Sequence, residues 1–213
     1  MADFQTQIED LTGSIGDTTA LTSWLTDAAK EIINILPPKL KEKCTTATGV
    51  GTDFKVDLDG LGEILYVTRE NANSGYYTPC REIPSMYGGL STDSTSMMYY
   101  ATATDPVYWI DGDTSGAATL YVKPTPTADQ PAILHHIAYP SVAYSDSVVA
   151  NFPDEAEYLV VLYAAIKATE YMLLAEEDAE VYAPQLATLK QDYQQGIAIL
   201  KGGEASPQQR GGR

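Results

Sequence analysis

The pattern of apolar positions is clearest between Asn151 and Leu174, where it predicts a long buried helix. Pro153 has the φ angle of a first helical turn, and the acidic residues directly after it suit the positive end of a helix dipole. Apolar residues then recur at spacings of three and four, the period of one helix face. A helix this apolar must pack against other helices or a neighbouring subunit. The residues predicted to make that packing are Tyr158, Leu159, Leu162, Ile166 and Leu173.

Two amphipathic patterns precede this helix. The first begins near Phe4 and stops at Gly13. The second has Asp17 or Thr18 as its N-cap, because short polar side chains accept hydrogen bonds from the first free amides of a helix. It ends at the proline pair 37–38, since the residue before a proline is pushed out of the helical region. The first 44 residues are therefore predicted to form helices of a bundle.

One amphipathic pattern follows the long helix. A break is predicted near Pro184, after which apolar residues from Leu186 to Leu200 mark a last helix closed by the glycines at 202–203. Residues 202–213 contain no apolar residue larger than alanine. Such a segment buries too little surface to offset its ordering entropy. It is predicted to be flexible unless a partner holds it.

Between residues 45 and 140 the pattern changes to short strands separated by turn residues. Consecutive strands with brief connections favour an antiparallel meander, and one short helix capped by Ser91 or Asp93 is expected inside STDSTSMMYYATA. The predicted fold is α+β: a helical bundle (1–44 and 141–201) with an inserted antiparallel β-rich subdomain (45–140) and a flexible tail (202–213). The segments predicted as strands are DFKVDL, EILYVTRE, YYTPCREI, PVYWID, ATLYVKP and AILHHIAYP.

Composition narrows the possible partners. The chain has 213 residues with 13 basic and 29 acidic side chains, a formal net charge of −16. This surface repels phosphate backbones, so specific nucleic-acid binding is not expected. DNA can still pass along such a surface without binding to it. No apolar run reaches the roughly 18 residues of a membrane span, and no signal-peptide layout is present, so no membrane partner is predicted. Two cysteines, Cys44 and Cys80, indicate a reducing compartment.

The candidates for chemistry are weak. His135 and His136 are neighbours on a predicted strand and point to opposite faces, so they cannot chelate one metal from one side. DGDTSG, residues 111–116, matches the first half of a calcium loop, but Val122 stands where the bidentate glutamate belongs. A turn between two strands explains that segment better. Pairs of acidic residues close together in the sequence are expected by chance in a chain with 29 acidic side chains. No catalytic residue, metal or cofactor is predicted.

The order of four segments along the chain resembles that of the head-to-tail adaptor (connector) proteins of tailed bacteriophages. These segments are LTSWLTDAAKEIINILP, LYVKPTP, HHIAYPSV and FPDEAEYLVVLYAA, and the resemblance covers about residues 18–200. It implies a helical bundle with a β-rich elaboration, and a ring of twelve copies beneath the portal protein in the virion neck, assembled in the host cytoplasm. It also implies contact with the next neck or tail component. By position, it places portal contacts on Pro207, Gln208, Gln209, Arg210 and Arg213.

Two other classes stay open from the sequence. One is another virion structural protein, such as a stopper, a tail tube or a capsid accessory protein. The other is a soluble acidic binding module or an enzyme. A monomer that is inert to portal protein would favour a module, and the position of the chain in a virion density map separates the two virion interpretations.

Overall fold

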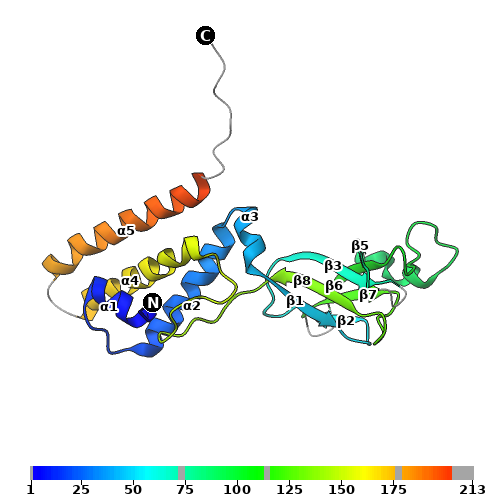
Figure 1. Cartoon of the computed structure of the whole chain (residues 1–213), viewed down its shortest axis with the longest axis horizontal. Coiled ribbons are helices and arrows are strands. Elements are labelled where there is room, and N and C mark those ends of the chain that lie inside the picture. Colours follow the sequence, from blue (N-terminus) through cyan, green and yellow to red (C-terminus); the bar gives the residue numbers. More distant parts are fainter. Residues whose placement is uncertain (1, 72–74, 113–115, 176–178, 203–213) are drawn as a thin grey trace, which may run out of the picture. The chain divides into compact units, whose positions relative to one another are not determined.

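The computed structural model describes residues 2–71, 75–112, 116–175 and 179–202. The chain divides into two compact units, one made of residues 1–44 and 139–213 and the other of residues 45–138 (Figure 1). The first unit is helical and the second is built from strands. The α+β fold class predicted from the sequence is thereby confirmed.

The helical unit is arranged around α4 (Asp154–Ala175), which packs against α1, α2 and α5. Its buried side chains come from every long helix and include Phe4, Ile8, Leu21, Leu25, Ile32, Leu159, Val160 and Leu189. The other elements are α1 (Phe4–Thr12), α2 (Thr18–Ile35), α3 (Pro38–Lys41), the short 3₁₀ helix η1 (Glu42–Cys44) and α5 (Ala179–Gly202).

Local chemistry sets most of the helix ends. Asp17 is the N-cap of α2, and its carboxylate accepts hydrogen bonds from the amides of Thr19 and Ala20 at 3.1 and 2.9 Å. Helix α2 ends at Ile35, and its C-cap Leu36, the residue before the proline pair, is extended, as predicted. The break predicted at Pro184 is wrong, because α5 contains that proline near its start. Pro184 is the sixth residue of α5, so the helix continues through it with one backbone hydrogen bond fewer.

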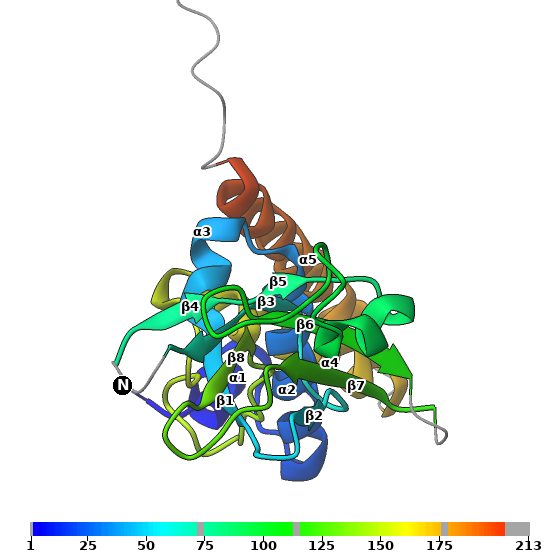
Figure 2. The same cartoon turned by 90° about the vertical axis from the view of Figure 1, so that its right-hand side faces the viewer.

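The β unit contains two four-stranded sheets, with strand orders β1-β8-β3-β4 and β2-β7-β6-β5 (Figure 2). Alternate residues of both sheets meet in a shared core made of Val50, Val67, Leu120, Val122, Ala132 and Leu134. The strands are β1 (Thr45–Val50), β2 (Lys55–Asp57), β3 (Ile64–Glu70), β4 (Tyr77–Pro79), β5 (Arg81–Glu82), β6 (Val107–Gly112), β7 (Ala118–Lys123) and β8 (Ala132–Ile137).

The predicted antiparallel meander is wrong, because strands far apart in the chain pair with each other: β2 with β7, and β8 with both β1 and β3. Strand β1 was not predicted. It pairs with β8, the last strand of the unit in the sequence. Strands β5 and β6 run parallel, because the connection from Ile83 to Pro106 is long enough for a parallel crossover. The helix expected within residues 91–103 is also wrong: a 3₁₀ helix, η2 (Ser85–Thr92), forms earlier in that connection, and turns follow it.

Candidate interaction surfaces

The residues predicted for packing on α4 divide into three groups. Leu159 and Ile166 are buried inside the chain's own helical unit, so they have no surface left for a neighbouring subunit. Leu162 and Leu173 are half-buried. Tyr158 is 44% exposed and, of the five, offers the most to another molecule. The apolar pattern therefore correctly indicated a buried helix face, most of which is covered within one chain.

Helix α5 lies close against α4. A Cβ added to Gly196 would stand 2.5 Å from Leu159 Cδ2 and 2.7 Å from Tyr158 Oη, so only glycine permits this approach. The Tyr193 hydroxyl donates to Glu31 Oε1 at 3.1 Å, and burial raises the pKa of this tyrosine. These contacts fix one side of α5, while its other side, including Ile199, is exposed.

An ion-pair group also joins α4 to α5. The Glu170 carboxylate on α4 contacts Lys190 Nζ on α5 at 2.9 Å and Lys167 Nζ on its own helix at 3.2 Å. The hydrogen bond from Lys190 is the main cause that lowers the pKa of Glu170. All three side chains are partly exposed, so this group orients α5 more than it stabilises it.

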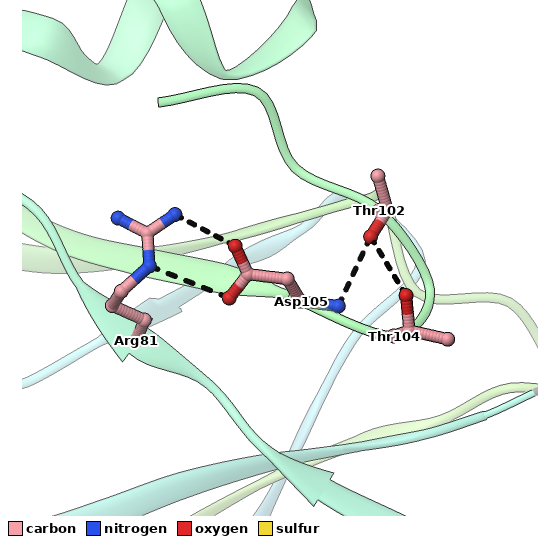
Figure 3. Close-up of polar contacts among 4 residues, drawn as sticks. All are labelled: Arg81, Thr102, Thr104 and Asp105. Carbon is pink, nitrogen blue, oxygen red and sulfur yellow. Dashed lines mark hydrogen bonds and ion pairs between the residues drawn. The ribbon is translucent and has the colours of Figure 1, made fainter. Parts of the chain in front are cut away.

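In the β unit, the connection 83–106 is fixed at its base by an ion pair (Figure 3). Arg81 donates from Nη2 to Asp105 Oδ2 at 2.9 Å and from Nε to Oδ1 at 3.3 Å. This bond raises the pKa of the Arg81 guanidinium. The Asp105 amide donates to Thr102 Oγ1 at 3.0 Å, and the hydroxyl groups of Thr102 and Thr104 lie 3.1 Å apart. The two hydrogen bonds between Arg81 and Asp105, together with the turn at residues 102–105, hold the end of the connection beside β5.

The middle of the same connection lies over the outer face of the β6 and β7 sheet. Gly88 approaches Trp109 so closely that an added Cβ would lie 2.6 Å from the indole ring. The Ser91 hydroxyl donates to the Gly88 carbonyl at 2.6 Å. The rings of Tyr87 and Tyr99 stack with their centres 4.3 Å apart, which joins the two halves of the connection. The segment is therefore held at a fixed position on the sheet.

The outward side of this connection carries large apolar side chains among short polar ones such as Thr92, Ser94 and Thr95. Met97 is fully exposed and Met86 is 78% exposed. Three of the five methionines of the chain fall within residues 86–98, a cluster that the sequence analysis did not use and that was the available signal. We call this side the methionine surface; it consists of Met86, Leu90, Met97, Met98 and Tyr100.

The other sheet carries aromatic rings on its outer face. Tyr66 on β3 stacks on its cross-strand partner His135 on β8, with ring centres 4.3 Å apart. Tyr77 on β4 pairs with Glu70 on β3, two residues after Thr68 and four after Tyr66, so Tyr66 and Tyr77 share a face. Both tyrosines are exposed by more than two fifths. We call Tyr66, Tyr77 and His135 the tyrosine surface.

The two histidines have different surroundings, as expected for neighbours on a strand. His136 is buried, with Nε2 3.0 Å from Thr48 Oγ1 and Nδ1 2.9 Å from the Ile137 carbonyl oxygen. Burial, together with the nearby His136, lowers the pKa of His135. Neither ring is placed to share a ligand with the other.

The described part of the chain holds no group of three or more His, Cys, Asp or Glu side chains that could bind a metal ion. Both cysteines are free thiols. Burial raises the pKa of Cys44 to about 11 and that of Cys80 to about 12, so both stay protonated near neutral pH. Among the described helices, none combines the length and apolar character that crossing a membrane requires.

Two predicted features lie outside the described residues in whole or in part. The portal-contact residues Pro207, Gln208, Gln209, Arg210 and Arg213 all fall in the segment 203–213. The DGDTSG segment connects β6 to β7, which pair as an antiparallel hairpin, and its residues 113–115 are not described.

Comparison with known proteins gives one family. The model of the SU10 adaptor protein family matches residues 1–212. No curated protein matches the chain.

Proposed function

The chain belongs to the SU10 adaptor protein family, and on this premise we propose that it is the head-to-tail adaptor of a phage virion. In this role, copies of the chain form a ring beneath the portal protein. The ring joins the DNA-filled capsid to the tail and lets DNA pass. The observation that carries the proposal is the family match over nearly the whole chain.

The proposed ring has twelve copies, as the resemblance to connector proteins implies. Each subunit has different surfaces on its two sides, and such a head-to-tail contact closes into a ring when its rotation allows. In the helical unit, the surfaces available to a neighbour are Tyr158 on α4 and the exposed side of α5. The half-buried Leu162 and Leu173 extend the contact.

The electrostatics support passage of DNA without binding. The net charge of −16 gives phosphates few counter-charges, and DNA binding depends on such charges. The proposal includes no catalysis, no metal and no cofactor. Among the described residues, no group of three or more His, Cys, Asp or Glu side chains could hold a metal ion, and both cysteines are free.

The tail is proposed to dock on the portal protein through Pro207, Gln208, Gln209, Arg210 and Arg213. Helix α5 ends at Gly202, and the residues after it span at most about 40 Å when extended. Arginine forms forked hydrogen bonds with carboxylates and carbonyl groups, so the fitting partner is an acidic or carbonyl-rich groove. Twelve such tails act together at high effective concentration.

The proposal places the protein in the virion neck, with assembly in the host cytoplasm, and gives it a further contact with the next neck or tail component. The test is a density map of the virion together with native mass spectrometry of the purified chain and the portal protein of the same phage. A ring of this chain directly beneath the portal is expected. Density for the chain in the tail tube or on the capsid, or a monomer that ignores portal protein, would overturn the proposal.

A further inference from the structure

The connection that carries the methionine surface is held to the sheet at two points, although the methionine side chains themselves face solvent. Its backbone is tied to β5 by the Arg81–Asp105 fork and to β6 by the Gly88–Trp109 approach. Large exposed apolar patches on proteins mark interaction sites. A backbone that is already held in place loses little further entropy on binding. This surface is therefore prepared for a partner before the partner arrives.

The charge pattern indicates what kind of partner fits. Between Ile83 and Thr104 the only charged side chain is Asp93, in a chain of net charge −16. On the other sheet, β1 has no charged residue beside β8 and its His135, and Glu70, the cross-strand partner of Tyr77, is buried. Two copies of an acidic protein repel each other at most places. The methionine and tyrosine surfaces are thus places where copies can approach at low electrostatic cost.

The chemistry of the two surfaces is complementary. Thioether sulfur makes favourable contacts with aromatic rings, and the flexible methionine side chain adapts to the shape it meets. Beside the methionine surface lies an open hollow of about 290 Å³, lined by Thr92, Tyr100, Lys123 and Thr125 among others. An aromatic ring of another copy can enter this hollow.

The fold places the two surfaces on opposite sides of the β unit. The two sheets share one core between them. The connection that carries the methionines covers the outer side of one sheet, and its Tyr99 and Ala101 join a cluster with Val107 and Trp109. Tyr66 and Tyr77 lie on the outer side of the other sheet. A contact between the two surfaces must therefore join different copies head to tail, the arrangement that closes into rings.

We propose that the methionine surface of one copy packs on the tyrosine surface of the next copy. This contact rests on the ring of the proposed function and assigns the β unit a direct part in holding that ring together.

The test uses the full-length chain with two variants, one carrying Met86→Gln, Met97→Gln and Met98→Gln, the other Tyr66→Ser and Tyr77→Ser. Self-association is measured by sedimentation velocity and native mass spectrometry, alone and with the portal ring. Each variant alone is expected to associate at least tenfold more weakly than the wild type. Mixed together, they keep one intact pair of surfaces and should associate more strongly with each other than either variant does alone.

The controls separate this contact from folding and from surface hydrophobicity. Leu174→Gln removes an 88% exposed apolar side chain from the helical unit and should leave the β-unit contact unchanged. The substitutions Tyr66→Phe and Tyr77→Phe keep both rings and should restore association. Circular dichroism should show the same folded state for every variant, since all the changed side chains are exposed.

Two results would decide against the proposal in distinguishable ways. If the wild type forms rings and the methionine variant forms the same rings with the same affinity, the methionine–tyrosine contact is wrong while the proposed function stands. If the wild type forms no ring either alone or on the portal, the proposed function fails and this contact fails with it.

Discussion

At the scale of single residues, Gly196 decides how closely α5 lies on α4. Its missing side chain leaves room for Leu159 and Tyr158, and Leu159 is fully buried, with little space to move. Gly196→Ala is therefore expected to destabilise the protein by about 1–3 kcal/mol, the usual cost of overpacking a close contact. Urea unfolding measures this change. The matched control is Gly202→Ala on the same helix, where no atom lies within 4 Å of the added Cβ; equal unfolding midpoints for the two variants would contradict the interpretation.

The Cys44 thiol predicts a loss of stability at alkaline pH. Burial raises its pKa from the ordinary 9.0 to about 11, so the folded state holds this proton more tightly than the unfolded state does. The resulting stabilisation is complete below pH 9 and is lost as the pH rises to about 11. The free energy of unfolding, measured from pH 8 to 11, should fall less steeply in Cys44→Ala than in the wild type. Parallel curves would show that Cys44 does not contribute, since other ionising groups are common to both proteins.

At the scale of elements, the sequence predicted what local chemistry determines. The Asp17 cap, the stop at residues 37–38 and the start of α4 after Pro153 depend on neighbours in the chain, and the structure contains all three. Strand β1 escaped prediction because TTATGV has no apolar alternation and its partner, β8, is far away in sequence. Helix α5 continues through Pro184 because its later residues pack on α4.

The sequence predicted the interaction surfaces only in part, because the exposure of a residue depends on contacts with segments far away in the chain. Apolar periodicity identified α4, but it could not separate a face covered by the same chain from one open to a neighbour. Leu159 and Tyr158 are adjacent in sequence and differ completely in exposure. The methionine surface has no period, since its shape comes from a connection pinned at Gly88 and at Arg81. Only the concentration of methionines in the sequence indicated it.

The connection between β5 and β6 gives the prediction at this scale. In Gly88→Ala the new methyl group would collide with the Trp109 ring, whose position is fixed by stacking on Tyr121. The connection is expected to lift from the sheet and expose the indole, which shifts tryptophan fluorescence to longer wavelength. Gly89→Ala is the neighbouring control, because nothing lies within 4 Å of its added Cβ. An unchanged emission spectrum in Gly88→Ala would show that this approach does not hold the connection.

At the scale of the whole molecule, the tail is expected to serve attachment and not folding. The described part of the helical unit already contains a buried core formed by all of its long helices, so deleting 203–213 should leave the unfolding midpoint unchanged. Binding to the portal ring should weaken at least tenfold, because several tethered segments are lost together. The double variant Arg210→Gln and Arg213→Gln tests whether charge carries the effect. A deleted protein that binds portal with wild-type affinity would place docking elsewhere.

The division into two units leads to the last prediction. Strands β1 and β8 carry the two ends of the β unit, and they pair antiparallel with Thr45 opposite Ile137, so those ends lie side by side. An insertion whose ends are adjacent can be removed without stretching the rest of the chain. Each unit also has its own core, around Leu25 and Leu159 in the helices and around Val67 and Leu134 in the strands.

Joining Cys44 to Tyr139 through a short Gly-Ser linker should therefore leave a helical unit that unfolds cooperatively, as measured by circular dichroism. Residues 45–138 expressed alone should give the dispersed amide spectrum of a folded β protein in NMR. Collapse of either part into an unfolded chain would show that the units depend on each other for stability. If both parts fold, the isolated β unit can also be tested for the methionine–tyrosine contact, and association of that unit alone would separate its part in the ring from that of the helices.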